Sequence, residues 1–268
     1  MSKVWFITGS SRGLGRSFAE AALARGDKVA ATARDVASLD ALTAYGDAVL
    51  PLKLDVTDKA AVFDAVRQTR QHFGRLDAIV NNAGYGLFGA VEELSDKDLR
   101  DQLETNLFGP LWVVQAALPI MREQGGGHII QISSTGGQVS LPLGGGYHAS
   151  KFALEGLSDS LAQEVAGFGI KVTVVEPSFY ATDGAAGAVN SAADPLYDGV
   201  RESFVAFAKT LDVGDPAAAG RALLKLADSN DPPLRVFFGT EGLRMTQLAY
   251  ADRLKLWAKW EDLSAEAH

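Results

Sequence analysis

The stretch TGSSRGLGR, residues 8–16, decides the fold that we expect, because its glycines 9, 13 and 15 directly follow the apolar run KVWFIT. Glycine reaches positive φ and allows close backbone approach, and the free N–H groups at a helix start attract a pyrophosphate. The spacing Gly-x-x-x-Gly-x-Gly differs from the Gly-x-Gly-x-x-Gly fingerprint of the general dinucleotide fold, so a tight turn without a ligand is the alternative. The stretch predicts a strand, a glycine turn and a helix that begins near residue 13.

Six further apolar runs follow the same plan along the chain, with helical patterns at about 13–26, 58–73, 96–122 and 147–167. Runs that are mostly apolar throughout, rather than alternating, are typical of strands buried on both faces. Because strands and helices alternate, we predict an α/β fold, a doubly wound (Rossmann-type) domain with a seven-stranded parallel sheet flanked by helices. Its ligands should bind beyond the carboxyl ends of the strands. The seven runs are KVWFIT, KVAATA, AVLPLKL, LDAIVN, GHIIQIS, IKVTVVE and LRVFFG.

The composition narrows the class of protein. The 268 residues, 47% of them hydrophobic, can bury a full core, and because no linker or repeat divides them we expect a single domain over 1–268. A net charge of -8 argues against a nucleic-acid partner. Without cysteine, and with four histidines that show no ligand spacing, no metal site is expected. No apolar run is long enough for a signal segment or a membrane span, so the sequence predicts a soluble, cytoplasmic protein with no membrane partner.

The segment YHASKFALEGLSDSLAQEV, residues 147–165, has the periodicity of a helix. Tyr147 and Lys151 lie at i and i+4, so phenol and ammonium project from the same face of its first turn. A nearby cation stabilises a phenolate and lowers the pKa of the tyrosine. The pair is therefore a candidate acid–base group, although an accidental surface pair at this spacing is common.

Five motifs occur in an order that resembles the short-chain dehydrogenase/reductase family, from about Lys3 to Phe238. They are Thr8-Gly-x-x-x-Gly-x-Gly15, NNAG at 81–84, Asn106, Ser134, and Tyr147-x-x-x-Lys151. The resemblance implies an oxidoreductase that interconverts a carbonyl and a secondary alcohol by hydride transfer with a nicotinamide cofactor. It also implies a small-molecule carbonyl or alcohol substrate, and a homodimer or homotetramer.

The resemblance assigns the catalytic roles to Asn106, Ser134, Tyr147 and Lys151. Tyr147 would exchange the proton, Lys151 would tune it and hold the nicotinamide ribose, and Ser134 would hydrogen-bond the substrate oxygen. In the family the asparagine anchors a relay water. Pro110, which has no N–H to give, should kink the helix and free the Asn106 carbonyl, although a kink without function is an ordinary alternative.

The end of the second strand, ATARD, bears on the cofactor. An NAD enzyme places an acid here and an NADP enzyme places arginine nearby. Aligned to the family, the position of the acid is occupied by Ala33, and Arg34 follows it. Arg12, in the glycine turn, should lie near the same part of the cofactor, so we expect NADP. Asp35 keeps NAD as the runner-up, and Asp55 has the alternative role of helix cap. The implied cofactor-binding residues are Gly9, Ser11, Arg12, Gly13, Leu14, Gly15, Arg34, Asp55, Val56, Asn82, Ala83, Gly84, Tyr147, Lys151, Pro177 and Thr182.

Two segments concern the substrate and the assembly. Segment 178–215 is irregular, rich in aromatic residues and poor in basic ones, which predicts a mobile lid over an uncharged, largely apolar substrate, with a plain core helix as the alternative. Ser178 stands where the family has glycine, which puts the nicotinamide contact there in doubt. The tail forms an expected helix over 241–262 that packs on a partner subunit or closes the monomer core.

Three other functions fit the same fold. They are an NAD(H)-dependent dehydrogenase, a non-catalytic cofactor-sensing protein, and an epimerase or isomerase that holds its cofactor tightly.

Overall fold

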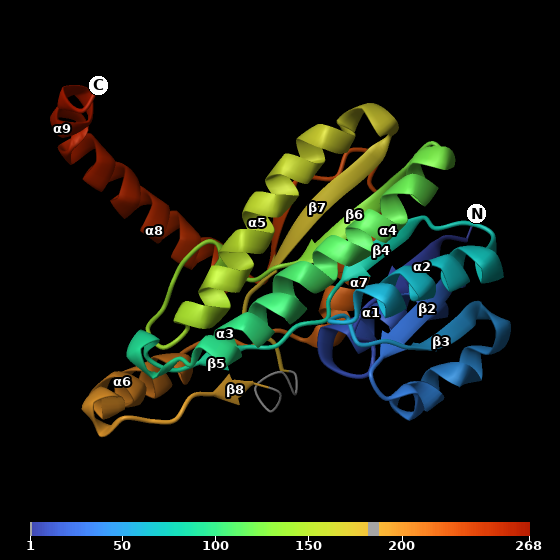
Figure 1. Ribbon diagram of the computed structural model, residues 1–268, viewed down its shortest axis with the longest axis horizontal. Helices are drawn as coiled ribbons and strands as arrows, with labels where there is room; N and C mark the ends of the chain where they lie inside the picture. The colour runs from blue at the N-terminus through green and yellow to red at the C-terminus, as the bar shows by residue number, and fades with distance from the viewer. Residues whose placement is uncertain (1, 182–187) are drawn as a thin grey trace.

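The computed structural model describes residues 2–181 and 188–268, and its centre is a seven-stranded sheet in the order β3-β2-β1-β4-β6-β7-β9 (Figure 1). Every neighbouring pair of strands in it is parallel. The predicted Rossmann-type fold is confirmed, and each apolar run forms one strand. The strands are β1 (Val4–Ile7), β2 (Lys28–Ala33), β3 (Val49–Lys53), β4 (Ala78–Asn81), β6 (Gly127–Ile132), β7 (Ile170–Pro177) and β9 (Arg235–Phe238).

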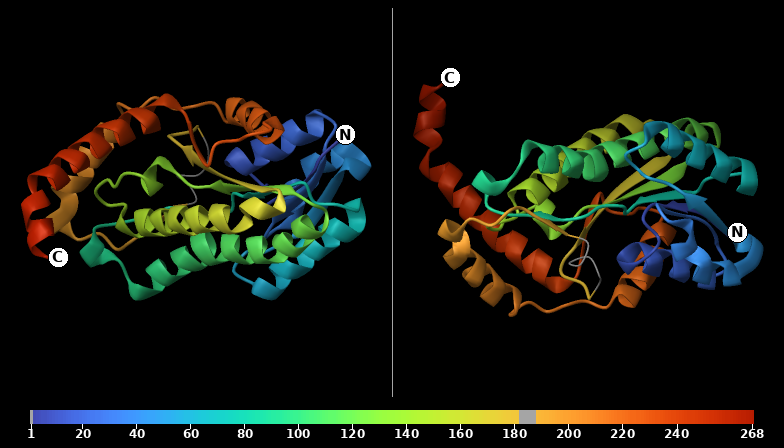
Figure 2. Two further views of the ribbon diagram at one scale, coloured as in Figure 1. Left: turned by 90° about the horizontal axis from the view of Figure 1, so that it is seen from above. Right: turned by 60° about the horizontal axis from the view of Figure 1, so that its bottom comes forward.

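Helices cover both faces of the sheet (Figures 1 and 2). One face carries α1 (Gly13–Ala24), α7 (Pro216–Asp228) and the 3₁₀ segment η1 (Val36–Ala48). The other face carries α2 (Lys59–Phe73), α4 (Gly109–Glu123) and α5 (Gly145–Val165). Single 3₁₀ turns occur at η2 (Val91–Glu93), η4 (Thr135–Gly137), η5 (Ala166–Phe168) and η7 (Pro195–Tyr197).

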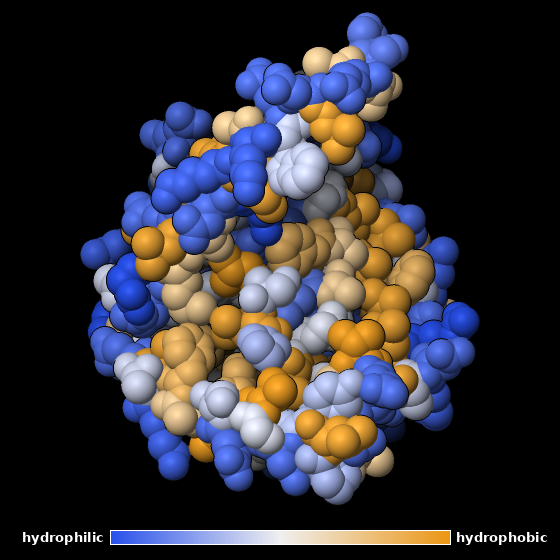
Figure 3. All heavy atoms as spheres, turned by 90° about the vertical axis from the view of Figure 1, so that its left-hand side faces the viewer, coloured by the Kyte–Doolittle hydropathy of each residue, from blue (hydrophilic) through white to orange (hydrophobic). Residues whose placement is uncertain are grey.

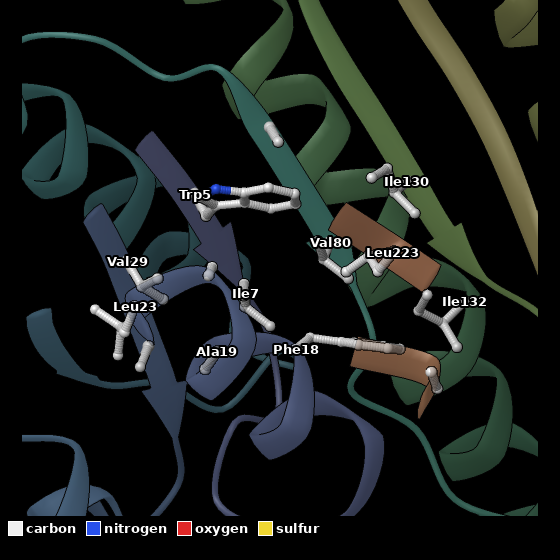
Figure 4. Close-up of a cluster of buried hydrophobic side chains, with 14 of the residues drawn as sticks. Trp5, Ile7, Phe18, Ala19, Leu23, Val29, Val80, Ile130, Ile132 and Leu223 are labelled. Atoms are coloured by element: carbon white, nitrogen blue, oxygen red, sulfur yellow. The ribbon is translucent and has the colours of Figure 1, made fainter. Parts of the chain in front are cut away.

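Two hydrophobic cores lie between these layers, and β1 contributes side chains to both. Successive side chains of a strand point to opposite faces, so Trp5 and Ile7 enter the core beneath α1 and α7, while Phe6 enters the core beneath α2 and α4. Phe18 of α1 and Leu223 of α7 close the first core and are fully buried (Figure 4). Because β1 is apolar on both faces, the sheet packs between two helical layers. The glycine turn follows directly after the carboxyl end of β1.

Several elements lie outside these layers. Strands β5 (Leu87–Phe88) and β8 (Val189–Asn190) form a separate two-stranded parallel sheet, which two-residue runs gave no means of predicting. Helix α6 (Asp198–Ala208) has no buried residue. The chain ends in α8 (Thr240–Lys259) and α9 (Glu261–Glu266), which point away from the body (Figure 1). Over the described residues, no helix combines the length and apolar content that a bilayer crossing requires.

Candidate active site

A cleft of about 1170 Å³ opens at the carboxyl ends of the central strands. Its walls come from the turns after β1, β2, β3, β4, β6 and β7, which is where a parallel sheet of this order presents a ligand site. Of the residues assigned from sequence, Gly15 and Asn106 do not line it and Thr182 lies outside the described residues. Those that line it are Gly9, Ser11, Arg12, Gly13, Leu14, Arg34, Asp55, Val56, Asn82, Ala83, Gly84, Ser134, Tyr147, Lys151 and Pro177.

The glycine turn has the geometry of a phosphate cradle. Gly9 and Gly13 adopt positive φ values of 69° and 58°, which L-residues rarely reach. A Cβ on Gly15 would come within 2.3 Å of both the Asn82 Nδ2 atom and the Gly9 carbonyl oxygen. The first two glycines therefore shape the turn, and the third allows α1 to start close against the β4 turn.

Asn82 holds this turn in place from the neighbouring strand. Its amide Nδ2 donates to the carbonyls of Thr8 (2.9 Å) and Gly9 (3.1 Å). The Thr8 hydroxyl accepts in return from the backbone N–H groups of Asn82 and Ala83, both at 3.0 Å. The NNAG motif thus acts largely by bracing the glycine turn, although Asn82, Ala83 and Gly84 also line the cleft.

Ser134, Tyr147 and Lys151 meet at the inner end of the cleft. Ser134 lies two residues beyond β6, at the N-cap of η4, where its hydroxyl accepts from the Gly136 N–H at 3.0 Å and hydrogen-bonds the Tyr147 phenol. Lys151 is buried, and its Nζ atom lies 5.8 Å from the centre of the Tyr147 ring. Phenol, hydroxyl and ammonium therefore face one space, the arrangement that proton exchange with a bound oxygen requires.

The sequence-based account of the Tyr147 pKa was wrong for this state of the protein. Burial raises the pKa of the phenol, and the hydrogen bond with Ser134 offsets only part of that rise. Lys151 does not dominate because its Nζ atom donates to the Ile132 carbonyl at 2.8 Å, and burial lowers the pKa of that ammonium to about 8. The phenol accordingly stays protonated at neutral pH, the form that donates to a developing alkoxide.

Asn106 is buried in η3 (Glu104–Phe108), a π-helical segment that joins α3 (Asp96–Leu103) to α4. The Gly109 N–H reaches back to the Glu104 carbonyl, so the helix widens just before Pro110 instead of breaking. The side chain of Asn106 donates to the Tyr85 carbonyl (3.0 Å) and accepts from the Tyr85 N–H (3.2 Å). Its amide thus positions the loop after β4, beside the cleft.

His148, directly after Tyr147, is a positioning residue that the sequence interpretation missed. Its Nε2 atom accepts from the Leu141 N–H at 3.0 Å, which leaves Nδ1 to donate to the Gly136 carbonyl at 3.0 Å. Burial lowers the pKa of His148 and keeps it neutral. The ring therefore ties the first turn of α5 to the loop that carries Ser134. Its position next to the candidate tyrosine was the only signal.

The nucleotide end of the cleft carries two guanidinium groups. Arg12 and Arg34 are exposed and line the cleft, and within residues 2–181 and 188–268 neither forms a salt bridge. Asp35 instead caps η1 by accepting from the Ala37 N–H at 3.1 Å. Asp55 lines the cleft and accepts from the Thr57 N–H at 3.0 Å, whereas the cap of α2 is Asp58.

Ser178 has a structural role of its own. Its hydroxyl accepts from the Gly242 N–H at 2.8 Å, which satisfies one of the free donors in the first turn of α8. Among the described residues, Leu143 is the one non-glycine with positive φ, so Ser178 carries no backbone strain of the left-handed kind. The departure from the family glycine therefore anchors the C-terminal helix to the end of β7.

Apolar side chains line the outer end of the cleft. The Phe88 ring centre lies 6.2 Å from that of Tyr147. Asp101 and Glu104 add two carboxylates, and the basic residues of the cleft are confined to Arg12, Arg34 and Lys151 over the described chain. The other large apolar or aromatic residues at this end are Tyr85, Phe179, Tyr180, Val189, Leu211 and Val213.

Glu93 fastens the segment that follows β8. Its side chain is 3% exposed, accepts from the N–H groups of Asp194 and Ala90 at 2.7 Å each, and pairs with Arg201. The hydrogen bond from the Asp194 N–H is the main reason that the pKa of Glu93 is lowered to about 2. Arg201, the basic residue in the middle of segment 178–215, is thus already neutralised.

Comparisons with known proteins agree with this geometry. A family model described as short chain dehydrogenase matches residues 3–192. The chain is 42% identical to the oxidoreductase BOA17 of Botryotinia fuckeliana, over 98% of each protein. A short-chain dehydrogenase from Streptomyces avermitilis is 39% identical with a TM-score of 0.94, over 100% of this chain and 98% of that one. An alcohol dehydrogenase of Thermococcus sibiricus, solved with 5-hydroxy-NADP, is 26% identical with a TM-score of 0.74, over 89% of this chain and 96% of that one. The chain belongs to the short-chain dehydrogenase family of oxidoreductases.

Proposed function

We propose that this protein interconverts a carbonyl and a secondary alcohol on an uncharged, largely apolar substrate, with NADP(H) as the cofactor. The observation that carries the proposal is the meeting of the Ser134 hydroxyl, the Tyr147 phenol and the Lys151 ammonium in one cleft. The cleft also contains the glycine turn, so a candidate nucleotide-binding turn and candidate acid–base groups line the same space.

Each residue has a distinct task in the reduction direction. Ser134 donates a hydrogen bond to the substrate carbonyl and orients it, and Tyr147 delivers a proton to that oxygen as it becomes an alcohol. Lys151 re-protonates or steadies the phenol and supplies a donor to the cofactor ribose. The nicotinamide, when bound, supplies the hydride. Oxidation of the alcohol runs through the same groups in reverse.

Positive φ at Gly9 and Gly13 leaves a cradle without Cβ atoms, which fits the pyrophosphate of either NAD or NADP. Two other observations favour NADP over NAD. Arg12 and Arg34 line the nucleotide end, where guanidinium groups suit a 2′-phosphate. Asp35, the carboxylate that would bind a free 2′-hydroxyl, is engaged as the cap of η1.

The substrate end favours apolar compounds. Phe88, Phe179 and Leu211 offer apolar area, while Asp101 and Glu104 would repel an anionic substrate. Since apolar contacts give affinity without fixing direction, the hydrogen bonds of Ser134 and Tyr147 would orient the reacting oxygen. Several ring or chain ketones should therefore be accepted.

The decisive experiment is turnover of NADPH with matched carbonyl substrates, such as cyclohexanone against a keto acid of similar size. Reduction of the neutral ketone with a clearly higher kcat/KM is expected. Tight NADPH binding without turnover on any ketone or aldehyde would instead indicate a cofactor-sensing protein. Nucleotide that stays bound through purification, with no net redox turnover, would indicate an epimerase or isomerase.

A further inference from the structure

A second cavity, of about 490 Å³, lies between α5, β7, β9 and α8. Over the described residues it shares no lining residue with the cleft of the candidate active site. Helix α8 passes along one side of the cavity, and the rest of that helix then stands clear of the body above a face rich in hydrophobic residues (Figure 3). Charged and aromatic side chains share the walls, chiefly Glu155, Glu176 and Arg235 with Phe152, Phe237 and Tyr250.

Negative charge is in excess in this cavity, because three carboxylates and one guanidinium face it within the described chain. The Arg235 Nε atom donates to Glu155 at 3.0 Å, and its Nη2 atom lies 2.6 Å from the Asp159 carboxylate. Nε is 3.6 Å from the Oε1 atom of Glu176, which is too long for a hydrogen bond. Arg235 is therefore engaged mainly by the two carboxylates of α5 and leaves Glu176 only partly neutralised.

Glu176 is the most deeply buried charged group of the cavity, with a side chain that is 1% exposed. Its Oε1 atom accepts from the Gln138 amide at 2.8 Å, and the Tyr250 hydroxyl fixes that amide by donating to its oxygen at 2.5 Å. The Oε2 atom has no hydrogen-bond partner in the described part of the chain, and neither has the buried Thr246 hydroxyl on the α8 wall. Because buried polar atoms are nearly always satisfied, two open acceptors in one cavity indicate a ligand that brings donors.

The walls select the kind of cation. In residues 2–181 and 188–268, no group of three or more His, Cys, Asp or Glu side chains is arranged to hold a metal ion. A guanidinium prefers both oxygens of one carboxylate, whereas Glu176 offers a single free oxygen. An ammonium needs only separate acceptors, and aromatic faces suit a cation that carries an apolar body. Phe152 and Tyr250, which are 36% and 41% exposed, leave such a body a way in from solvent.

We propose that this cavity binds a primary organic ammonium ion with an apolar body. The N–H groups of the ligand donate to the free oxygen of Glu176 and to the Thr246 hydroxyl, and its body packs against Phe152, Phe237 and Tyr250. The excess negative charge attracts the cation, and the buried oxygen fixes its position. Because this site is separate from the cleft, it binds its ligand independently of the proposed reaction.

Protons compete with the ammonium for Glu176. Burial, with two carboxylates of α5 nearby, raises the pKa of Glu176 to about 7. The carboxyl is therefore mostly protonated at pH 6 and mostly ionised at pH 8, so the affinity for an ammonium should rise roughly tenfold between them. Glu176→Gln should lose this dependence, which separates Glu176 from the rest of the cavity. The other titratable groups that face the cavity are Glu155, Asp159, Arg235 and Tyr250.

Binding of benzylammonium to the full-length protein tests the site, measured by isothermal titration calorimetry at pH 8. Saturable binding is expected, clearly tighter than that of benzyl alcohol, which has the same ring and no charge. Glu176→Gln keeps the shape of the side chain but removes the charge, so it should weaken binding by roughly tenfold or more. Thr246→Val, a second variant of similar shape, should weaken binding less. Asp101→Asn, which alters a carboxylate of the cleft instead, is the control and should bind as the wild type does.

Three outcomes would overturn the proposal. One is a wild-type protein that shows no saturable binding of benzylammonium. Another is binding that Glu176→Gln leaves unchanged, since the ammonium would then lie elsewhere, and a loss caused by Asp101→Asn would place it in the cleft. The third is equal affinity for benzyl alcohol, since the cavity would then select apolar bulk rather than charge. None of these measurements uses turnover, so the result does not depend on the proposed reaction.

Discussion

The Lys151 ammonium donates to the Ile132 carbonyl at 2.8 Å, so the side chain one helical turn past Tyr147 is held by the last residue of β6. This bond joins α5 to the strand that ends two residues before Ser134. It places the cation beneath the tyrosine ring and at the wall of the cleft at once. Loss of Lys151 should therefore disturb both the proton donor and the cofactor site, whereas loss of the phenol hydroxyl should disturb only the first.

We expect Tyr147→Phe to lower kcat by about 10²-fold to 10⁴-fold, because it removes the proton donor and leaves the ring in place. The dissociation constant for NADPH, measured by fluorescence titration, should stay nearly unchanged. Lys151→Ala should lower kcat and weaken NADPH binding together. Substantial turnover by the phenylalanine variant would remove Tyr147 from its role.

Cofactor choice should follow the two arginines of the nucleotide end. Arg34→Ala should lower kcat/KM for NADPH by roughly tenfold to a hundredfold with little change for NADH, since a charge-assisted hydrogen bond is worth about 1.5–3 kcal/mol. Arg12→Ala should act in the same direction. Equal kcat/KM for both cofactors in the wild type, or an NADH preference that Asp35→Ala erases, would favour the NAD alternative.

The Glu93–Arg201 pair should control the mobility of the proposed lid. Arg201→Gln removes the cation from the buried Glu93 carboxylate, so hydrogen exchange over residues 189–201 should become faster and KM should rise. The matched control is Arg67→Gln, which breaks the exposed pair with Asp64 of α2, away from the cleft. Since the pKa of Glu93 is lowered to about 2, the pair is lost only as pH falls well below the usual range of a glutamate. Uniformly slow exchange in both proteins would identify the segment as a fixed core element.

Stability should depend on pH through Glu176, which is fully buried in β7. Burial, with Glu155 and Asp159 nearby, raises its pKa to about 7 in spite of Gln138 and Arg235. The folded state therefore holds this proton more tightly than the unfolded chain, so the contribution of Glu176 is complete below about pH 4.5 and is lost as pH rises through 7.

The change in the free energy of unfolding that Glu176→Gln causes should accordingly differ between the two pH values. It should be more stabilising at pH 8 than at pH 5, by an amount on the order of 2 kcal/mol. Urea denaturation of the wild type and the variant at both pH values measures this difference. The exposed Glu123→Gln serves as the control. The same effect of Glu176→Gln at both pH values would show that the carboxyl keeps one protonation state throughout.

Close packing at Gly15 should make its substitution costly. The Cβ of Gly15→Ala would meet the Gly9 carbonyl oxygen at 2.3 Å, so the turn must shift, with an expected loss of roughly 1–3 kcal/mol of stability and much weaker NADPH binding. Gly156→Ala is the matched control, since nothing lies within 4 Å of its added Cβ, and it should stabilise α5 slightly. If both variants bind NADPH as the wild type does, the glycine turn is not the nucleotide cradle.

The sequence by itself determined the layers of the fold and the local parts of the site. Strands buried on both faces are apolar throughout, so each apolar run identified one strand. The order of strands and helices then predicted the parallel sheet. The glycine turn and the pairing of Tyr147 with Lys151 were equally legible, because each depends on spacing within a single turn or helix.

Only the tertiary structure decided what depends on contacts between distant segments. The bracing of Gly9 by Asn82, the bond of Ser178 to Gly242 and the pairing of Glu93 with Arg201 each join segments whose local sequence does not indicate a partner. The direction in which the Tyr147 pKa shifts also depends on tertiary contacts. Burial raises it, and burial is set by everything packed around the ring rather than by the lysine four residues along the helix. Local spacing fixes which groups share a turn, while desolvation and long-range hydrogen bonds arise only when the whole chain closes around them.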